Sequence, residues 1–533
     1  MELEFPGGRR TLVVVGNGMV GHKLVEILVD RGATAEWDIV TFCEEPRPAY
    51  DRVGLSAFFA GTSPDELSLV APGFYEQAGL RIHLGDRAVA IERDKQVVVS
   101  ANGVRIPYDA VVLATGSYPF VPPVPGHDAQ GVFVYRTIED VEAIREYAKQ
   151  RRVGAVVGGG LLGLEAANAL VSLSLETHVV EFLPRLMGMQ VDDAGGAALR
   201  RRIEELDVNV HTSSAVTEVV VDGDGAATGL RFKEGDDLAA DMVVFSAGIR
   251  PRDELARAAG LEMGERGGIV VDASCRTSDP SIYAIGECAV AEGRIWGLVS
   301  PGYQMARVVA DRILGGDAVF AGADLSTKLK LLGIDVASFG DAFGTTPGSE
   351  SITYVDEVAS IYKKLVVGPP QKRSGRRTVV GGILVGDAST YQTLVQMARG
   401  DMPTPEHPEH LIFPAPNGNG NGADAAATGV ASLGAQAMVC SCNNVTKGDI
   451  CGVIAEGSTD VGAIKACTKA GTGCGGCVPL VTEILKDELR QAGVEVRNDL
   501  CEHFAYSRQE LFDLVRVQRL ATFSEVVSRH GTG

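Results

Sequence analysis

A glycine-rich turn between a predicted strand and a predicted helix constrains the fold of this chain more than any other feature. The apolar run Thr11–Val15 predicts a strand, and Gly16, Gly18 and Gly21 follow it at the start of a helical pattern. Gly16 permits a tight turn, Gly18 lets the backbone approach a pyrophosphate, and Gly21 allows close helix–strand packing. Glu44 ends the next predicted strand, where an acidic side chain can bind ribose hydroxyl groups. The motif predicts a Rossmann-like α/β unit that binds a dinucleotide.

The same pattern recurs farther along the chain, after another predicted strand, Val153–Val157. It contains three glycines at the same spacing: Gly158, Gly160 and Gly163. Two such units imply two nucleotides, and FAD with NAD(P)H is the usual pair. Glu181 closes the following strand, and a carboxylate there binds a ribose 2′-hydroxyl and repels a 2′-phosphate. We therefore expect NADH to be favoured over NADPH, although Arg185, four residues on, could weaken this preference.

The order of the predicted strands indicates that the second unit interrupts the first. An apolar run that ends in Thr115 and Gly116 precedes the second glycine motif, and a similar run ending in Gly248 follows the second unit. One more strand, Ile282–Gly286, then precedes Glu287. This layout resembles flavoproteins of the glutathione-reductase-like class. The resemblance implies that Thr115 and Gly116 lie near the FAD phosphates. It also implies that Glu287 binds the ribityl chain, at a position where Asp is more usual.

Composition and patterning divide the whole chain into six parts. We expect an FAD-binding domain (1–117 and 243–322), an NAD(P)H-binding domain (118–242), a small α+β domain (323–413), a flexible linker rich in Gly, Asn and Ala (414–437), a cysteine-rich domain (438–489) and a helical tail (490–533). The predicted fold class is therefore α/β, with two Rossmann-like domains and two smaller domains.

Four of the ten cysteines form two close pairs in the cysteine-rich domain: Cys440 with Cys442, and Cys474 with Cys477. Four thiolates in this arrangement suit tetrahedral zinc or a [2Fe–2S] cluster, and the spacing alone does not choose between them. The second pair lies in a glycine-rich segment whose backbone N–H groups could bond cluster sulfurs, which favours iron over zinc or free thiols. Cys451 and Cys467 lie outside the pairs, and we expect both to be buried apolar side chains.

Charge and composition exclude several classes of function. The formal net charge of -20 argues against non-specific nucleic-acid binding, which needs a basic surface. No apolar run approaches the ~20 residues of a membrane span, and no signal peptide opens the chain, so we expect a soluble, cytoplasmic protein. Cys43 has no second cysteine close by in the sequence, so we expect no disulfide relay beside a flavin.

Several motifs together resemble one family along essentially the whole chain. They include GNGMVGHKLVE (16–26), CEEPRPAYDRVGLS (43–56), VVGGGLLGLEAA (156–167), FSAGIRPRDELA (245–256), CSCNNVTKGDI (440–450) and CEHFAYSRQEL (501–511). These resemble the large subunit of bacterial NADH-dependent assimilatory nitrite reductase. The cysteine-rich domain resembles the bacterioferritin-associated-ferredoxin type of [2Fe–2S] domain within that subunit.

The resemblance implies an electron path from NADH through FAD to the [2Fe–2S] cluster and on to a nitrite-reducing centre. It places Arg52 near the flavin and Glu165 near the nicotinamide. Sirohaem and [4Fe–4S] are not expected on this chain, because only Cys501 follows Cys477. We therefore expect a truncated form or a naturally short electron-input subunit. Its expected acceptor is a sirohaem-containing domain or subunit, or a small nitrite reductase subunit, and a homodimer is compatible with this assignment.

Two other functions stay open at this point. A general NADH-dependent ferredoxin or rubredoxin reductase would use the same cofactors, although the tail segment 501–511 favours the nitrite reductase family. A non-catalytic redox sensor would also bind flavin and a cluster, but it would not need both complete nucleotide motifs.

Overall fold

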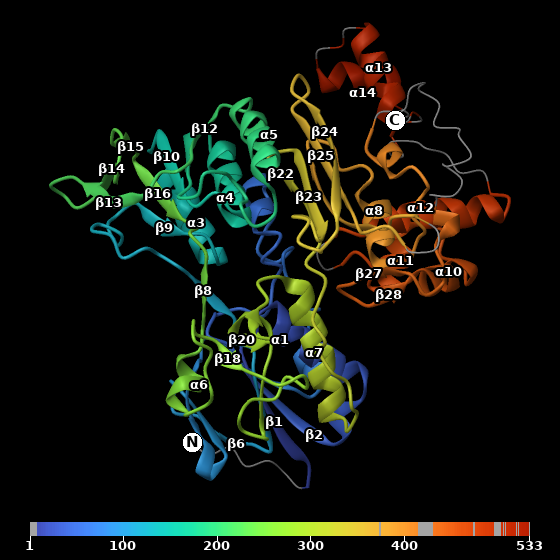
Figure 1. Ribbon diagram of the computed structural model, residues 1–533. Helices are drawn as coiled ribbons and strands as arrows, with labels where there is room; N and C mark the ends of the chain where they lie inside the picture. Colours follow the sequence, from blue (N-terminus) through green and yellow to red (C-terminus); the bar gives the residue numbers. More distant parts are fainter. Residues whose placement is uncertain are drawn as a thin grey trace.

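The computed structural model describes residues 8–371, 375–413, 430–472 and 475–494 and, near the C-terminus, 503–504, 506, 508–518, 520 and 522–531. Figure 1 shows a lower lobe that contains β1 and β2, an upper body of two further sheets, and a helical module beside them. In the described part of the chain, no helix is long and apolar enough to cross a membrane.

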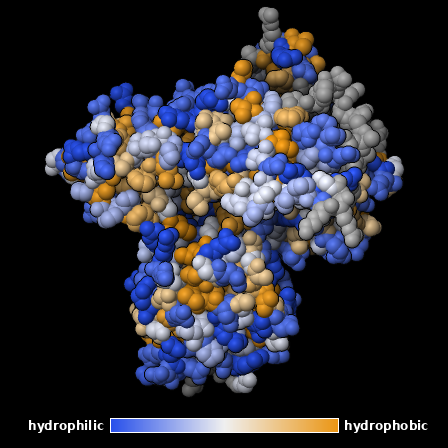
Figure 2. Space-filling model, in the orientation of Figure 1, coloured by the Kyte–Doolittle hydropathy of each residue, from blue (hydrophilic) through white to orange (hydrophobic). Residues whose placement is uncertain are grey.

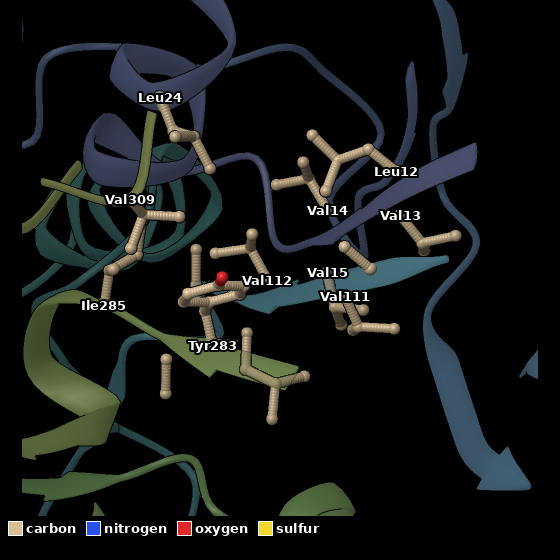
Figure 3. Close-up of a cluster of buried hydrophobic side chains, with 14 of the residues drawn as sticks. Leu12, Val13, Val14, Val15, Leu24, Val111, Val112, Tyr283, Ile285 and Val309 are labelled. Carbon is tan, nitrogen blue, oxygen red and sulfur yellow. The ribbon is translucent and has the colours of Figure 1, made fainter. Parts of the chain in front are cut away.

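The lower lobe is built on a parallel five-stranded sheet. Its order is β19 (Ile282–Ala284), β7 (Ala110–Leu113), β1 (Arg10–Val15), β2 (Trp37–Phe42) and β3 (Arg81–His83). Helices α1 (Met19–Asp30) and α7 (Val299–Ile313) pack against each other in this lobe. Figure 3 shows Leu24 of α1 and Val309 of α7 in one buried cluster with the strand residues. Burial on both faces explains why β1 from Leu12 onward and the whole of β7 are continuous runs of apolar residues.

Smaller elements surround this sheet. They are α2 (Phe74–Gln77), the hairpin strands β4 (Ala88–Glu92), β5 (Val97–Ser100) and β6 (Arg105–Pro107), helix α6 (Glu254–Ala258), and the strands β18 (Ile269–Val270), β20 (Ala289–Ala291) and β21 (Arg294–Ile295). Because β19 lies beside β7, the lobe is completed by chain that follows the second glycine motif, as the sequence predicts.

The second unit is also a parallel five-stranded sheet. Its order is β12 (Val208–His211), β11 (Glu176–Val180), β10 (Val153–Val157), β16 (Met242–Phe245) and β9 (Val132–Val134). Helices α3 (Ile138–Ala148), α4 (Leu161–Ser172) and α5 (Asp193–Glu204) and the antiparallel strands β13 (Val216–Val221), β14 (Ala227–Phe232) and β15 (Leu238–Ala239) complete it. The predicted boundary between residues 242 and 243 is wrong, because β16 pairs with β10 along its length. The chain leaves this unit after β16, where β17 (Ile249–Pro251) pairs with β8 (Ser117–Pro119) at the waist in Figure 1.

An antiparallel sheet forms the third unit. Its order is β22 (Thr327–Leu331), β23 (Ile334–Gly340), β26 (Val379–Val385), β25 (Ile361–Val367) and β24 (Glu350–Asp356). Helix α5 of the second unit packs on one side of this sheet, and α8 (Tyr391–Arg399) packs on the other (Figure 1). The Tyr362 hydroxyl donates to Asp192 at 2.8 Å, and Lys364 pairs with the same carboxylate at 3.1 Å, which links the two units.

The cysteine-rich module contains a two-stranded ribbon and three helices. They are β27 (Met438–Cys440), β28 (Val445–Thr446), α10 (Lys447–Ala455), α11 (Val461–Thr468) and α12 (Val478–Gln491). The prediction of a flexible linker up to residue 437 is wrong at its end, because Leu433 and Ala437 are buried in this module's core. Residues 414–429 of that segment lie outside the described residues. Two helices, α13 (Arg508–Gln518) and α14 (Phe523–His530), follow in the predicted tail.

Hydrophilic residues cover most of the face shown in Figure 2. Hydrophobic residues gather in the middle of this face, where the lower lobe meets the upper body. Buried apolar side chains also join the units, since Met19 and Tyr303 of the lower lobe lie in one cluster with Phe339 of the third unit.

Candidate functional site

The first glycine loop has the geometry that its sequence predicts. Gly16 has φ +110°, and a Cβ atom there would lie 2.3 Å from the Ala114 carbonyl oxygen. A Cβ on Gly21 would lie 2.1 Å from the Gly16 carbonyl oxygen. No heavy atom lies within 4 Å of a Cβ built on Gly18, the residue before α1. Gly16 and Gly21 are therefore required for packing, while Gly18 leaves open space at the helix N-terminus where a phosphate can approach.

The second loop repeats this geometry. Gly158 has φ +123°, and its Cβ would lie 2.2 Å from the Ser246 carbonyl oxygen. A Cβ on Gly163 would lie 1.8 Å from the Gly158 carbonyl oxygen, whereas a Cβ on Gly160 meets nothing within 4 Å. In both loops, a side chain at the middle glycine, Gly18 or Gly160, would fill the open space before the helix. Both loops therefore fit a dinucleotide pyrophosphate.

A cavity of ≈ 590 Å³ lies beside the first loop. Gly16, Glu44, Thr115 and Arg252 are among the residues that line it. Glu44 forms an ion pair with Arg252, and the Thr115 hydroxyl donates to the Arg252 carbonyl oxygen at 2.6 Å. The Arg252 N–H in turn donates to the carbonyl oxygen of Gly116 at 2.9 Å. The structure thus brings together the predicted residues of this site and adds Arg252, which lies in the motif 245–256 but had no predicted role.

Glu287 and Arg52 are joined by a residue that sequence reasoning missed, Arg136. Glu287 accepts hydrogen bonds from the Ser117 hydroxyl at 2.7 Å and from Arg136 Nη2 at 2.6 Å. Arg52 Nη1 donates to the Arg136 carbonyl oxygen at 3.0 Å, and Arg52 also forms an ion pair with Glu45. Arg136 precedes the N-cap of α3 and carries no motif, so no local signal could have identified it.

Glu181 lies directly against the second glycine loop. Its carboxylate accepts hydrogen bonds from the N–H groups of Gly159 at 2.6 Å and Leu183 at 2.7 Å. Arg185 does not pair with Glu181, because its guanidinium donates to the Val191 carbonyl oxygen and pairs with Asp193. Gly248, with φ +108°, accepts a hydrogen bond from the Phe120 N–H where the chain leaves the second unit.

Glu165 of α4 faces another carboxyl group across the boundary between the two dinucleotide units. Burial, and to a smaller extent the nearby charge of Asp51, together raise the pKa of Glu165 to about 7. Burial also raises the pKa of Asp51, although backbone N–H groups of Gly54 and Val53 oppose this. Of the adjacent residues Asp51 and Arg52, it is therefore Asp51 whose charge acts on Glu165.

Three of the four predicted cluster ligands lie within the described residues. Cys440, Cys442 and Cys477 are buried, and Cys474 lies outside the described residues. A hydrogen bond with the Cys477 thiol and the N–H groups of Gly471, Asn443 and Cys442 together lower the pKa of Cys440 to about 6 despite its burial. Buried, adjacent thiols with backbone donors fit a [2Fe–2S] cluster. Within the described residues, His, Cys, Asp and Glu side chains form no group of three that could hold a metal ion, and the fourth predicted ligand lies outside those residues.

The remaining described cysteines are not part of this set. Burial raises the pKa of Cys43 to about 11 and that of Cys275 to about 12, as expected of structural thiols. The expectation of burial is wrong for Cys467, which is exposed on α11. Cys451 is partly exposed, and its thiol donates to Glu488 at 3.2 Å.

Three family models match the chain. They are a pyridine nucleotide-disulphide oxidoreductase model (residues 10–308), a rubredoxin NAD+ reductase C-terminal domain model (326–399) and a BFD-like [2Fe-2S] binding domain model (438–487).

Curated relatives extend this similarity over nearly the whole chain. The nitrite reductase (NADH) large subunit of Escherichia coli (strain K12) is 53% identical over 98% of this chain and 61% of its own length. An assimilatory nitrate reductase electron transfer subunit of Bacillus subtilis (strain 168) is 34% identical over 90% of this chain and 60% of its own length. The chain therefore spans about three-fifths of the length of these relatives.

A solved structure shares the fold. The NAD-dependent persulfide reductase from A. fulgidus superposes with a TM-score of 0.66 at 28% sequence identity. The similarity covers 73% of this chain and 77% of that protein.

Proposed function

Because the chain belongs to the pyridine nucleotide-disulphide oxidoreductase family, we propose that it passes electrons from NADH to its own [2Fe–2S] module for nitrite reduction at a centre on another domain or subunit. The chain is an NAD(P)H-dependent FAD oxidoreductase with a BFD-like [2Fe–2S] domain. When bound, FAD exchanges hydride with the nicotinamide and the cluster exchanges single electrons. The protein's own contribution is to bind and orient these groups.

The observation that carries the proposal is the contact between the cysteine module and the lobe that holds the first glycine loop. Met19, the first residue of α1, and Tyr303 of α7 lie in the same buried apolar cluster as Cys440, Cys442 and Cys477. The helix that begins at the first dinucleotide loop thus packs in the same core as the cluster ligands. A cluster held by these cysteines would therefore share a buried core with the helix of the first dinucleotide loop, which supports the proposal of electron transfer between the two groups.

The choice of nicotinamide follows from Glu181. Its carboxylate is fixed against the second glycine loop, where a ribose 2′-hydroxyl can bond it and a 2′-phosphate is repelled. Arg185 is held by other partners and does not supply a positive charge for such a phosphate. We therefore assign NADH as the donor.

The acceptor follows from the relatives. The nitrite reductase large subunit of Escherichia coli and the nitrate reductase electron transfer subunit of Bacillus subtilis both cover nearly all of this chain. We propose a sirohaem-containing domain or subunit, or a small nitrite reductase subunit, as the partner. A cytoplasmic location and a homodimer stay predictions.

A general ferredoxin or rubredoxin reductase is the second candidate. The observation in its favour is the rubredoxin NAD+ reductase C-terminal domain match over residues 326–399. Its acceptor would be a small diffusible redox protein in place of a nitrite-reducing centre.

One experiment separates these two functions. The purified chain, loaded with FAD and iron, is reduced anaerobically with NADH, and flavin absorbance and the electron paramagnetic resonance signal of a reduced [2Fe–2S] centre are followed. The proposal predicts both changes, and nitrite-dependent NADH oxidation after a sirohaem-containing partner is added. Rapid reduction of rubredoxin or ferredoxin, with no turnover through the sirohaem partner, would establish the second candidate instead.

A further inference from the structure

Arg307 joins the lobe of the first dinucleotide loop to the loop that carries two cluster ligands. It lies on α7, and its Nη1 donates to the Cys442 carbonyl oxygen at 2.8 Å. Its Nη2 donates to the Ser441 carbonyl oxygen at 3.1 Å. One planar guanidinium therefore bonds two successive carbonyl groups of the Cys440–Cys442 segment, which restricts both its distance and its orientation.

The helix that carries Arg307 is itself firmly held. Met305, Ala306 and Val309 of α7 are buried in the core of the lower lobe, and α7 packs against α1. A second link lies nearby, where Lys469 pairs with Glu26 of α1 at 3.6 Å and the Asn443 side chain donates to the Lys469 carbonyl oxygen at 2.6 Å. The position of Arg307 is thus set by the lower lobe and not by the cysteine module.

The positive charge of Arg307 lies close to Cys440 and Cys442. Across the ranges that the structure describes, Arg307 forms no ion pair with Asp or Glu. Burial lowers its pKa, and the charges that oppose this lowering are those of Cys442 and Cys440. Arg399 of α8 provides a contrast, because it also reaches the loop, at 3.1 Å from the Ser441 hydroxyl, but is paired with Asp324.

We propose that Arg307 is a positioning residue that fixes the Cys440–Cys442 loop to the lower lobe, and that its positive charge raises the reduction potential of the bound cluster. Reduction adds one negative charge to a cluster that already carries four thiolates. A cation held nearby in a partly buried site stabilises the reduced form more than the oxidised form. Arg307 thereby favours electron entry into the module. The inference rests on the proposed function only for the identity of the cluster.

The test measures the midpoint potential of the cluster in the full chain loaded with FAD and iron. Potentials are set with redox dyes and dithionite, and the reduced cluster is quantified by electron paramagnetic resonance, so NADH is not needed. Arg307→Met should shift the cluster potential to a more negative value. At the wild-type midpoint, the ratio of reduced to oxidised cluster should fall about three- to tenfold. The flavin potential should change much less.

Two variants separate charge from geometry. Arg307→Lys keeps the charge but loses the double hydrogen bond, so it should retain most of the potential while it slows cluster reduction by NADH. Arg312→Met is the matched control, because Arg312 lies on the same helix but donates to the Ala318 carbonyl oxygen. It should alter neither the potential nor the rate.

The outcomes decide the proposal. A wild-type cluster potential in Arg307→Met would overturn it, as would an equal shift in Arg312→Met. Should Arg307→Met fail to retain iron, Arg307→Gln is measured in its place, and a wild-type potential there has the same meaning. Failure of NADH to reduce the wild-type chain would contradict the proposed function, but the dye-mediated potential would still test Arg307.

Discussion

Glu181 accepts a hydrogen bond from the N–H of Gly159, with 2.6 Å between the carboxylate oxygen and the nitrogen. The acidic side chain is thus fixed by the same loop that is expected to hold the pyrophosphate. A carboxylate held in this way cannot turn aside to admit a 2′-phosphate. We therefore expect the backbone of the loop to contribute to discrimination between the two nicotinamide nucleotides.

Replacement of Glu181 should reduce this discrimination. In Glu181→Ala, the ratio of kcat/KM for NADH to that for NADPH should fall about tenfold or more, because one charged hydrogen bond to the ribose and one repulsion are both lost. Glu176→Ala is the matched control, since Glu176 begins the same strand and is exposed. Steady-state turnover with an artificial acceptor measures both ratios, and equal ratios in the Glu181 variant and wild type would contradict this role.

Gly160 and Gly163 of the second loop should respond differently when each is replaced by alanine. Gly160→Ala should leave the melting temperature unchanged and weaken NADH binding about tenfold, because its Cβ enters open space where the pyrophosphate approaches. Gly163→Ala should lower stability by about 2–4 kcal/mol, because its Cβ would lie 1.8 Å from a carbonyl oxygen. Thermal melts and NADH titrations of both variants test this contrast. Equal melting temperatures for the two variants would refute it.

Loss of one cluster ligand should separate the two redox groups. Cys477→Ser should retain FAD and be bleached by NADH, but it should lose the iron and the signal of the reduced cluster, because serine is a poor ligand for this iron. Cys467→Ser should behave as wild type, since Cys467 is exposed and lies outside the two pairs. Iron analysis and electron paramagnetic resonance make the comparison, and iron loss in both variants would point to another set of ligands.

Glu165 should make stability depend on pH in a particular direction. Its pKa is about 7 in the folded chain against the ordinary glutamate value of 4.5, so between these values the folded state binds more protons than the unfolded state. Stability therefore falls as pH rises through this window. Relative to wild type, Glu165→Gln should gain about 1–3 kcal/mol on going from pH 5 to pH 8.

Melting temperatures of the holoprotein at the two pH values measure this gain. Glu146→Gln serves as the control, because the Glu146 side chain is 75% exposed and should show no such gain. A pH-independent difference between Glu165→Gln and wild type would show that Glu165 is ionised throughout.

The sequence predicts local features of this protein well and long-range ones poorly. Gly16 and Gly158 take positive φ values because a strand must turn sharply into a helix, and that requirement is visible in a few adjacent residues. The ion pairs of Arg136 with Glu287 and of Arg252 with Glu44 join residues 151 and 208 positions apart, respectively, and no local pattern encodes them.

Two incorrect predictions have related physical causes. The boundary at residue 242 fails because β16 enters the sheet between β10 and β9, and strand order is a property of the whole sheet. Burial of Cys467 fails because α11 is a short surface helix that buries Ile464 but leaves Cys467 exposed. Residue type alone does not determine which side of such a helix meets solvent.

The place of β19 beside β7 has a consequence for how the protein is made. Ile282–Ala284 leave the ribosome only after the entire NAD(P)H-binding unit has been synthesised. The inserted unit can therefore fold while the first sheet still lacks its last strand. The cavity beside the first glycine loop is lined by residues from both sides of this insertion, including Thr115 and Arg252. A flavin bound in this cavity could therefore be held only after the inserted unit has been synthesised.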